Sequence, residues 1–513
     1  MKKIILKVIS CLFCIVLLFC LTSCNGGKPT ISTAFAHYDG IYPKLEWQNI
    51  EGREGWSAKV VIKDLKGETV FETSGITQNT YTVKANLSAG QEYKTFVYFK
   101  NPQGKEGLLG GIKDDGIRVI YNKPQGKYYF DGGISLDTLN NYLNRSMHYA
   151  GLDPEPENYE VVEKSIIGTG TKYVQRAGGA WHPSAWDETG GNLAGIVERL
   201  HAIDPEIIFE ACIFECITPA VNDIAIPEEV FKAFGLTPEN RNFDFEKMVF
   251  PSGYGLGQWG ENTGIPDITQ IEAQMFFYHR ARFYIDSGFE ALHLGQAKWM
   301  GRKDKNNECW TKVIGMIRDY AKENARRHYV IINAHYPGQE FFDKNGNALV
   351  DFNAFPARMK VAEDQKDHKP RKNEPQKCVI VPGHKDSIYK LGIKSTSPGG
   401  WYTNKFPYLV EVDNYGVAKE KHQNKASKDI WGYDEITWFA IQPQWYRHEF
   451  TEYLIKEIDS FGENGHMSVV GKRWITPVDA SNGSDCYYAA GGIGVNYYGD
   501  LEFYRDMWDR LGK

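Results

Sequence analysis

The fold is decided by the stretch KYVQR at residues 172–176, NLAGIVERLHAI at 192–203 and IIFEACIFE at 207–215. We expect the first piece to be a short strand, and the last piece is a largely apolar run, as in strands that are buried on both faces. The middle piece has apolar residues three and four positions apart, which predicts an amphipathic helix. Strand, helix and strand in this order form a βαβ unit, in which the two strands run parallel.

The same alternation continues along the chain and predicts an α/β domain over residues 127–513. The domain has nine candidate strands, one more than the eight of a barrel, so a (β/α)8 TIM-type barrel with insertions fits best. A doubly wound open sheet is the alternative, but no G-x-G-x-x-G turn follows an early strand. The expected strands are 128–131, 172–176, 207–215, 291–294, 329–333, 348–353, 408–413, 436–441 and 467–474, and the expected helices are 135–150, 192–203, 268–286, 307–327, 445–461 and 501–511.

Residues 31–123 have a different pattern, in which short alternating segments are separated by turn residues. The expected strands at 58–63, 69–73, 80–83 and 92–99 indicate a β-sandwich, so the chain is multidomain. On this fold pattern the region resembles immunoglobulin-like and fibronectin type III domains. We expect it to space or support the larger domain, because no residue in it suggests chemistry.

The first 23 residues predict a signal peptide. Lys2 and Lys3 precede an apolar run from Ile4 to Leu21, and Leu-Thr-Ser-Cys follows at 21–24. This ending resembles the lipobox of bacterial lipoproteins, which implies lipidation of Cys24, a tether over residues 24–30 and an outer-membrane location in the cell envelope. An uncleaved membrane anchor is the alternative, and the periplasmic and surface faces of the membrane both stay open.

Composition and charge exclude several classes of function. The 513 residues have an ordinary globular composition and a formal net charge of −6, which is poorly matched to DNA or RNA. Aromatic residues make up 14 % of the chain, a high share that suits binding to the flat faces of sugar rings. Five cysteines lie beyond residue 24, and this odd, scattered set predicts neither a disulfide framework nor a zinc site.

Carboxylates lie at the ends of two expected strands, where a barrel gathers its reactive groups. Glu215 ends one strand, and Glu411 and Asp413 alternate along another, so that they share one face. Cleavage of a glycosidic bond needs two carboxyl groups around one pocket: one protonates the leaving oxygen, and the other attacks the anomeric carbon or activates water. We therefore expect Glu215 and Asp413 to be catalytic, with Glu411 as the substitute for either.

Polar and aromatic side chains that suit sugar binding follow the same strand ends. Imidazole, amide and phenol groups exchange hydrogen bonds with hydroxyl groups, and indole rings stack on C–H faces. Packing in the core is the alternative for at least half of the tryptophans. The expected substrate-binding residues are Trp181, His293, Gln296, Trp299, Asn333, His335, Tyr415 and Trp438.

Other chemistries lack a sequence motif. The chain has no G-x-S-x-G elbow, no H-E-x-x-H or EF-hand spacing and no Walker loop. We therefore expect neither a metal ion nor a cofactor. Convergence of His293, His335 and Asp413 on a metal ion is the alternative that spacing leaves open.

The lipobox, the sandwich and the aromatic-rich α/β domain together resemble Bacteroidota glycan-utilisation lipoproteins with a glycoside-hydrolase-like (β/α)8 domain. This resemblance implies a glycoside hydrolase that cleaves O-glycosidic bonds of a poly- or oligosaccharide. The family's usual Asn-Glu at the fourth strand is replaced here by His293-Leu-Gly-Gln296. That departure favours the alternative of a non-catalytic glycan-binding lipoprotein that uses the same aromatic cleft. A polysaccharide lyase or esterase is the third alternative.

Overall fold

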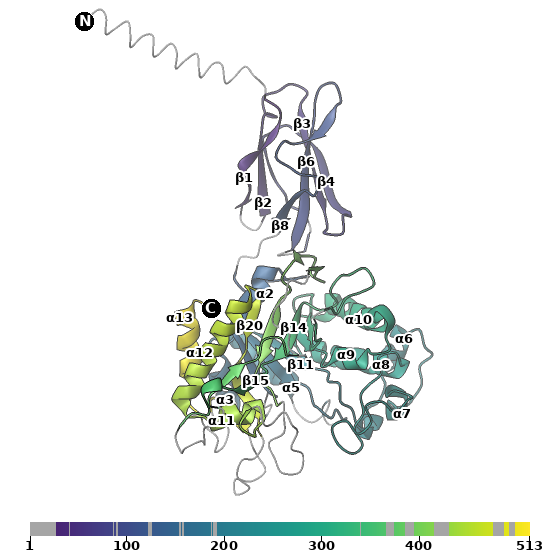
Figure 1. The fold of residues 1–513 in the computed structure, drawn as a ribbon. Coiled ribbons are helices and arrows are strands. Elements are labelled where there is room, and N and C mark those ends of the chain that lie inside the picture. Colours follow the sequence, from purple (N-terminus) through teal and green to yellow (C-terminus); the bar gives the residue numbers. More distant parts are fainter. Residues whose placement is uncertain are drawn as a thin grey trace, which may run out of the picture. The chain divides into compact units, whose positions relative to one another are not determined.

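In a computed structural model the chain forms two compact units, residues 1–125 and 126–513, each with its own hydrophobic core (Figure 1). Within the described ranges, no helix is both long and apolar enough to cross a bilayer. The structure describes residues 27–39, 42–85, 87–88, 91–121, 126–152, 155, 158–185, 187, 192–338, 340–365, 374–384, 394–414, 430–475, 487–491 and 498–513.

The first unit consists of two antiparallel sheets that share one core, in agreement with its alternating sequence pattern. Leu45 and Trp47 of one sheet are buried, and they belong to the same apolar cluster as Val60 and Val97 of the other. One sheet contains β1 (Thr30–Asp39), β2 (Tyr42–Gln48) and β5 (Thr80–Thr82), and the other contains β4 (Thr69–Ile76), β3 (Ser57–Lys63), β6 (Glu92–Lys100), β7 (Glu106–Leu108) and β8 (Ile117–Ile120).

The second unit is built around a ring of parallel strands. From β9 to β14, each strand pairs with the next strand along the chain, and β14 pairs with β19. Strand β20 pairs with β19, and strand β21 pairs with β9. Only Ser468 separates β20 from β21, so the two form one interrupted strand that closes a ring of eight positions, the topology expected of a (β/α)8 barrel. The strands are β9 (Ser146–Tyr149), β10 (Tyr173–Gly178), β11 (Ile208–Cys212), β12 (Ala291–His293), β13 (Ile331–Ala334), β14 (Phe352–Pro356), β19 (Tyr408–Glu411), β20 (Gly465–Met467) and β21 (Val469–Trp474), with β22 (Tyr487–Ala489) antiparallel to β21.

Helices follow most strands of the ring and cover it (Figure 1). The connections after β13 and β14 differ, because their described residues form loops and the short hairpins β15–β16 and β17–β18 without an α-helix. The longer helices are α3 (Tyr159–Ile166), α5 (Leu193–Ile203), α8 (Ile271–Asp286), α10 (Glu308–Asn324), α12 (Gln444–Phe461) and α13 (Leu501–Leu511), and the hairpin strands are Met359–Val361, Cys378–Ile380, Ser395–Thr396 and Tyr402–Thr403.

The first strand of the ring is not where the sequence placed it. Residues 128–131 form no strand, and β9 lies inside the region 135–150 that was expected to be one helix. Helix α2 (Leu136–Asn144) ends where Arg145 leaves the helical region with φ −116° and ψ 47°. All four residues of β9 are buried, so no alternation of polar and apolar residues marks it as a strand.

The segment 436–441, expected to be a strand, is instead the helix α11 (Glu435–Ile441). The side chain of Asp434 accepts hydrogen bonds from the backbone N–H of Thr437 over 2.9 Å and from its hydroxyl over 2.7 Å. This is the arrangement of a helix N-cap, and it satisfies a donor that the first turn leaves unpaired. A short apolar run is compatible with a strand or a helix, and here the N-cap at Asp434 favours the helix.

Candidate active site

A cavity of about 640 Å³ opens at the carboxyl ends of the ring strands. All eight positions of the ring contribute to its lining, from Ala150 after β9 to Trp474 at the end of β21. Barrels of this kind place their reactive groups at this face. The polar and aromatic lining residues are Arg176, Trp181, Phe214, Glu215, Trp259, His293, Gln296, His335, Arg358, Asp413, Asn414, Arg473 and Trp474.

Glu215 lies in the cavity wall with only 3 % of its surface exposed. The backbone and side-chain N–H groups of Gln296 each donate to one of its oxygens over 3.0 Å. Burial raises the pKa of the Glu215 carboxyl above its ordinary value, although these hydrogen bonds oppose the shift. Gly295 has a φ of 55°, and a Cβ there would collide with the carboxylate, so the close approach requires glycine. Glu215 is therefore a buried carboxyl that is biased toward its protonated form.

Glu411 lies behind the cavity wall, and both of its oxygens are occupied. Arg176 of β10 donates to it through Nε over 3.0 Å and through Nη2, and His148 Nδ1 of β9 lies 2.7 Å from Oε2. Arg176 starts from an irregularity in β10, where its φ is 58°. Although burial opposes ionisation, Arg176 and His148 hold the pKa of Glu411 well below its usual range. Glu411 is thus ionised and fixed in place.

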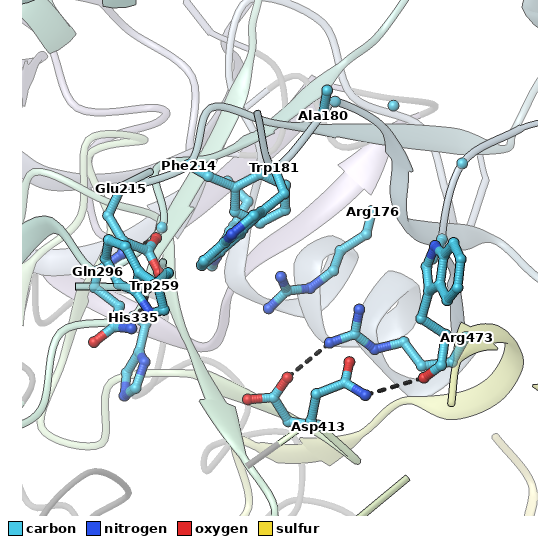
Figure 2. A pocket seen from close by; sticks show the side chains of 18 of the residues that line it. Arg176, Ala180, Trp181, Phe214, Glu215, Trp259, Gln296, His335, Asp413 and Arg473 are labelled. Atoms are coloured by element: carbon cyan, nitrogen blue, oxygen red, sulfur yellow. Dashed lines mark hydrogen bonds and ion pairs between the residues drawn. The ribbon is translucent and has the colours of Figure 1, made fainter. Parts of the chain in front are cut away.

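Asp413 lines the cavity beside two further arginines. Arg473 Nη2 donates to Oδ1 over 2.7 Å, and Arg358 Nη1 lies 3.8 Å from Oδ2. Although burial opposes ionisation, these guanidinium groups lower the pKa of Asp413 below its ordinary value. Figure 2 shows Asp413 and Glu215 on different sides of the cavity. The site therefore combines a carboxyl biased toward protonation with one biased toward ionisation.

A hydrogen-bonded network of buried side chains lies behind His293. Asn333 Nδ2 and the Tyr173 hydroxyl donate to the same oxygen of Glu210 over 2.6 and 2.7 Å, and Asn333 Oδ1 lies 2.6 Å from His293 Nδ1. Because an amide oxygen only accepts, His293 carries its proton on Nδ1 and has Nε2 as an acceptor. Burial lowers the pKa of His293 to about 3, so the ring is neutral.

Glu210 makes the stability of the second unit depend on pH. Burial raises the pKa of its carboxyl to about 7, so the folded chain keeps a proton that the unfolded chain releases at lower pH. This contribution to stability, roughly 3 kcal/mol at most, is complete below the unfolded pKa and is lost as the pH rises through the folded pKa. We expect urea unfolding to show this loss in the wild type and a flatter pH dependence in Glu210→Gln. Equal pH dependence in both proteins would contradict the raised pKa.

Three indole rings form a row beside Glu215, which we call the tryptophan row (Trp181, Trp259 and Trp299). The ring centroids of Trp181 and Trp259 are 5.2 Å apart in an edge-to-face contact, and those of Trp259 and Trp299 are 6.0 Å apart in a stacked contact. Trp181 and Trp299 are 37 % and 38 % exposed. Trp181 and Trp259 line the cavity (Figure 2), and Trp299 extends the row beyond the lining residues, so that two partly exposed indole rings stand near Glu215.

Most of the predicted site residues gather at this cavity. Those that line it are Glu215, Asp413, Trp181, His293, Gln296 and His335. Asn333 and Glu411 contact lining residues from behind, and Trp299 belongs to the tryptophan row. Tyr415 and Cys24 lie outside the described residues.

One expectation about the site is wrong, and one alternative finds no support among the described residues. Trp438 is not a sugar-binding residue, because it is fully buried in α11 and its Nε1 donates to the carbonyl oxygen of Gln376 over 2.7 Å. A strand at 436–441 would have ended at the cavity, whereas the helix turns this ring into the core. The alternative metal centre also fails: in the part of the chain that the structure describes, no group of three His, Cys, Asp or Glu side chains is placed to hold an ion.

The sequence analysis missed the three arginines that line the cavity, Arg176, Arg358 and Arg473. Two of them stand inside strand segments, at the end of KYVQR (172–176) and within SVVGKRW (468–474). An arginine in a strand that is buried in a sheet must find a partner or a functional position, because burying an unpaired charge is costly. The position of these arginines within expected strands could therefore have identified them as candidate site residues.

No protein-family model matches the chain, and no curated protein matches it. Among solved structures, the chain is similar to β-glucuronidases from Ruminococcus gnavus. A complex with D-glucuronic acid matches over 94 % of this chain and 67 % of the other, with 8 % identity and a TM-score of 0.33. The apo structure matches over the same shares, with 9 % identity and a TM-score of 0.34. The function proposed below rests on the geometry of the cavity itself.

Proposed function

We propose that this chain is a glycoside hydrolase that cleaves O-glycosidic bonds of a poly- or oligosaccharide, with Glu215 as the general acid. The observation that carries the proposal is the opposite bias of two carboxyl groups in one cavity, Glu215 toward protonation and Asp413 toward ionisation. Glycosidases need this division, because one group must give a proton while the other attacks or activates water.

The proposed roles follow from the contacts. Glu215 gives its proton to the glycosidic oxygen as the bond to the anomeric carbon breaks. Asp413, kept ionised by Arg473, either attacks that carbon or takes a proton from the attacking water. Glu411 fixes Arg176 and acts as a positioning residue. The neutral ring of His293 offers an acceptor for a sugar hydroxyl.

The test is product release from a broad panel. The full chain and Glu215→Gln are incubated with polysaccharides and with α- and β-linked nitrophenyl glycosides, and the released sugars are identified. Release of one class of sugar by the wild type alone supports the proposal, and NMR of the first anomer formed assigns Asp413 as nucleophile or base. Equal release by both proteins rejects Glu215 as the acid. Glycan binding without release by the wild type rejects a hydrolase and favours a glycan-binding protein.

Trp299 tests whether the tryptophan row binds the longer part of the glycan. We expect Trp299→Ala to raise the KM for long oligosaccharides about tenfold, near the 1.4 kcal/mol that one stacked ring supplies. Nitrophenyl glycosides, which are too short to reach Trp299, keep their KM. The control is Trp445→Ala, since Trp445 is 55 % exposed on α12 and does not line the cavity. An unchanged KM for long substrates would remove Trp299 from the binding surface.

A further inference from the structure

We propose, on the basis of the glycoside hydrolase function above, that the substrate is an acidic glycan. In this proposal a carboxylate or sulfate group of one sugar unit binds against Arg176, Arg358 and Arg473. These residues come from β10, from the connection after β14 and from β21, and all three line one cavity. Figure 2 shows Arg176 and Arg473 on the side of the cavity that holds Asp413.

The carboxyl groups that contact two of these arginines lie behind the wall of the cavity. Arg176 is held by Glu411, and Arg358 Nη1 is held by Glu435 over 3.0 Å. Neither Glu411 nor Glu435 is among the residues that line the cavity, and both are almost fully buried. Among the residues that the structure describes, the lining of the cavity therefore presents three guanidinium groups and one carboxyl group that is biased toward ionisation, Asp413.

This arrangement favours an anion over a neutral sugar. A guanidinium group is planar and always charged, and its N–H groups match two oxygens of a carboxylate or sulfate. The interaction is stronger in a partly enclosed cavity than in water. Arg473 lines the cavity, and only its Nη2 is recorded as donating to a carboxylate, that of Asp413. Arg176 and Arg473 are also pre-oriented, since each is already held by a carboxylate.

The position of the acid then gives the substrate a direction. Glu215 and Trp259 lie on one side of the cavity, and Arg176 and Arg473 lie on the other (Figure 2). Because Glu215 protonates the leaving oxygen, the leaving part of the glycan rests along the tryptophan row. The unit that carries the anionic group occupies the arginine side, where its anomeric carbon faces Asp413.

The test compares pairs of ligands of which one member carries an anionic group and the other does not. Binding to Glu215→Gln, which keeps the cavity but lacks the acid, is measured by calorimetry with D-glucuronate against D-glucuronamide and with glucose 6-sulfate against glucose. We expect the charged member of at least one pair to bind about tenfold more tightly or better, and the two pairs distinguish carboxylate from sulfate. The preference should weaken when NaCl is raised, because salt screens the charges. Equal affinity within both pairs overturns the proposal.

Variants separate this role from a purely structural one. Arg473→Gln should remove most of the preference for the charged ligand, and Arg473→Lys should restore part of it. Arg326→Gln is the matched control: Arg326 pairs with Glu290 at the opposite end of β12, and its loss should leave the preference unchanged. Arg473→Gln with a full preference overturns the assignment. If the wild type hydrolyses only neutral glycans, this inference fails while the hydrolase stands. If it binds acidic sugars without turnover, the hydrolase fails instead.

Discussion

Glu215→Gln is expected to lower kcat by about 100- to 10,000-fold, the usual contribution of a positioned general acid. Glutamine has the size of glutamate and keeps an oxygen that can accept from Gln296, so the wall of the cavity stays in place. The transferable proton is lost, together with one of the two oxygens that accept from Gln296. The measurement is kcat on the substrate found in the panel, together with the thermal unfolding midpoint and the affinity for the same glycan.

The control is Glu229→Gln, which removes a surface carboxylate whose side chain is 57 % exposed. It should leave kcat unchanged. Loss of kcat in Glu215→Gln with normal affinity and normal unfolding supports the acid role. Loss of kcat together with lower affinity and a lower unfolding midpoint would show that Glu215 stabilises the fold instead.

The pH profile of the same reaction follows from the two shifted carboxyl groups. Activity requires protonated Glu215, so it falls as the pH rises through the raised pKa of that residue. It also requires ionised Asp413, so it falls as the pH drops through the lowered pKa of Asp413. Gln296→Leu removes one donor that favours the Glu215 carboxylate and should move the alkaline limb to higher pH.

Glu411→Gln is expected to destabilise the second unit by about 3–5 kcal/mol, because it leaves Arg176 charged and without its partner in the interior. The native ion pair contributes stability above the unfolded pKa of glutamate, and this is lost as the pH falls through the lowered folded pKa. The variant should therefore lose less stability than the wild type on acidification. Urea unfolding at several pH values measures both effects.

The matched control for Glu411 is Glu228→Gln, which breaks an exposed helical pair with Lys232. An exposed pair of this kind contributes little, so the change should stay below about 0.5 kcal/mol. If Glu411→Gln instead unfolds like the wild type, the ion pair with Arg176 does not stabilise the second unit, and the expected destabilisation is wrong.

The strands of the ring were largely predictable, because parallel strands buried on both faces are short apolar runs. Residues 173–178, 208–212 and 291–293 lie within or beside the runs that predicted them. Burial on both faces also made β9 hard to predict, because its four buried residues follow helix α2 without a change in the sequence pattern. At 436–441 a six-residue apolar run could not distinguish strand from helix, and the hydrogen bonds of Asp434 decided it.

Part of the site was predictable, because the carboxyl ends of the parallel strands meet at one face of the barrel. That rule brought Glu215, His293, His335 and Asp413 to one cavity. It could not show that Glu411 would be held by Arg176, because the two residues are 235 positions apart in the chain. Trp438 was placed wrongly because the segment 436–441 was predicted to be a strand and is a helix. The direction in which a side chain points differs between the two elements.

The two connections without helices have an evolutionary consequence. The loops after β13 and β14 supply His335 and Arg358 to the cavity, yet no helix in their described residues ties them to the outer layer of the barrel. Insertions, deletions and substitutions there reshape the wall of the cavity without breaking helix packing elsewhere. Sequence changes in these two connections can therefore alter which ligand the cavity accepts while the strands of the ring keep their packing.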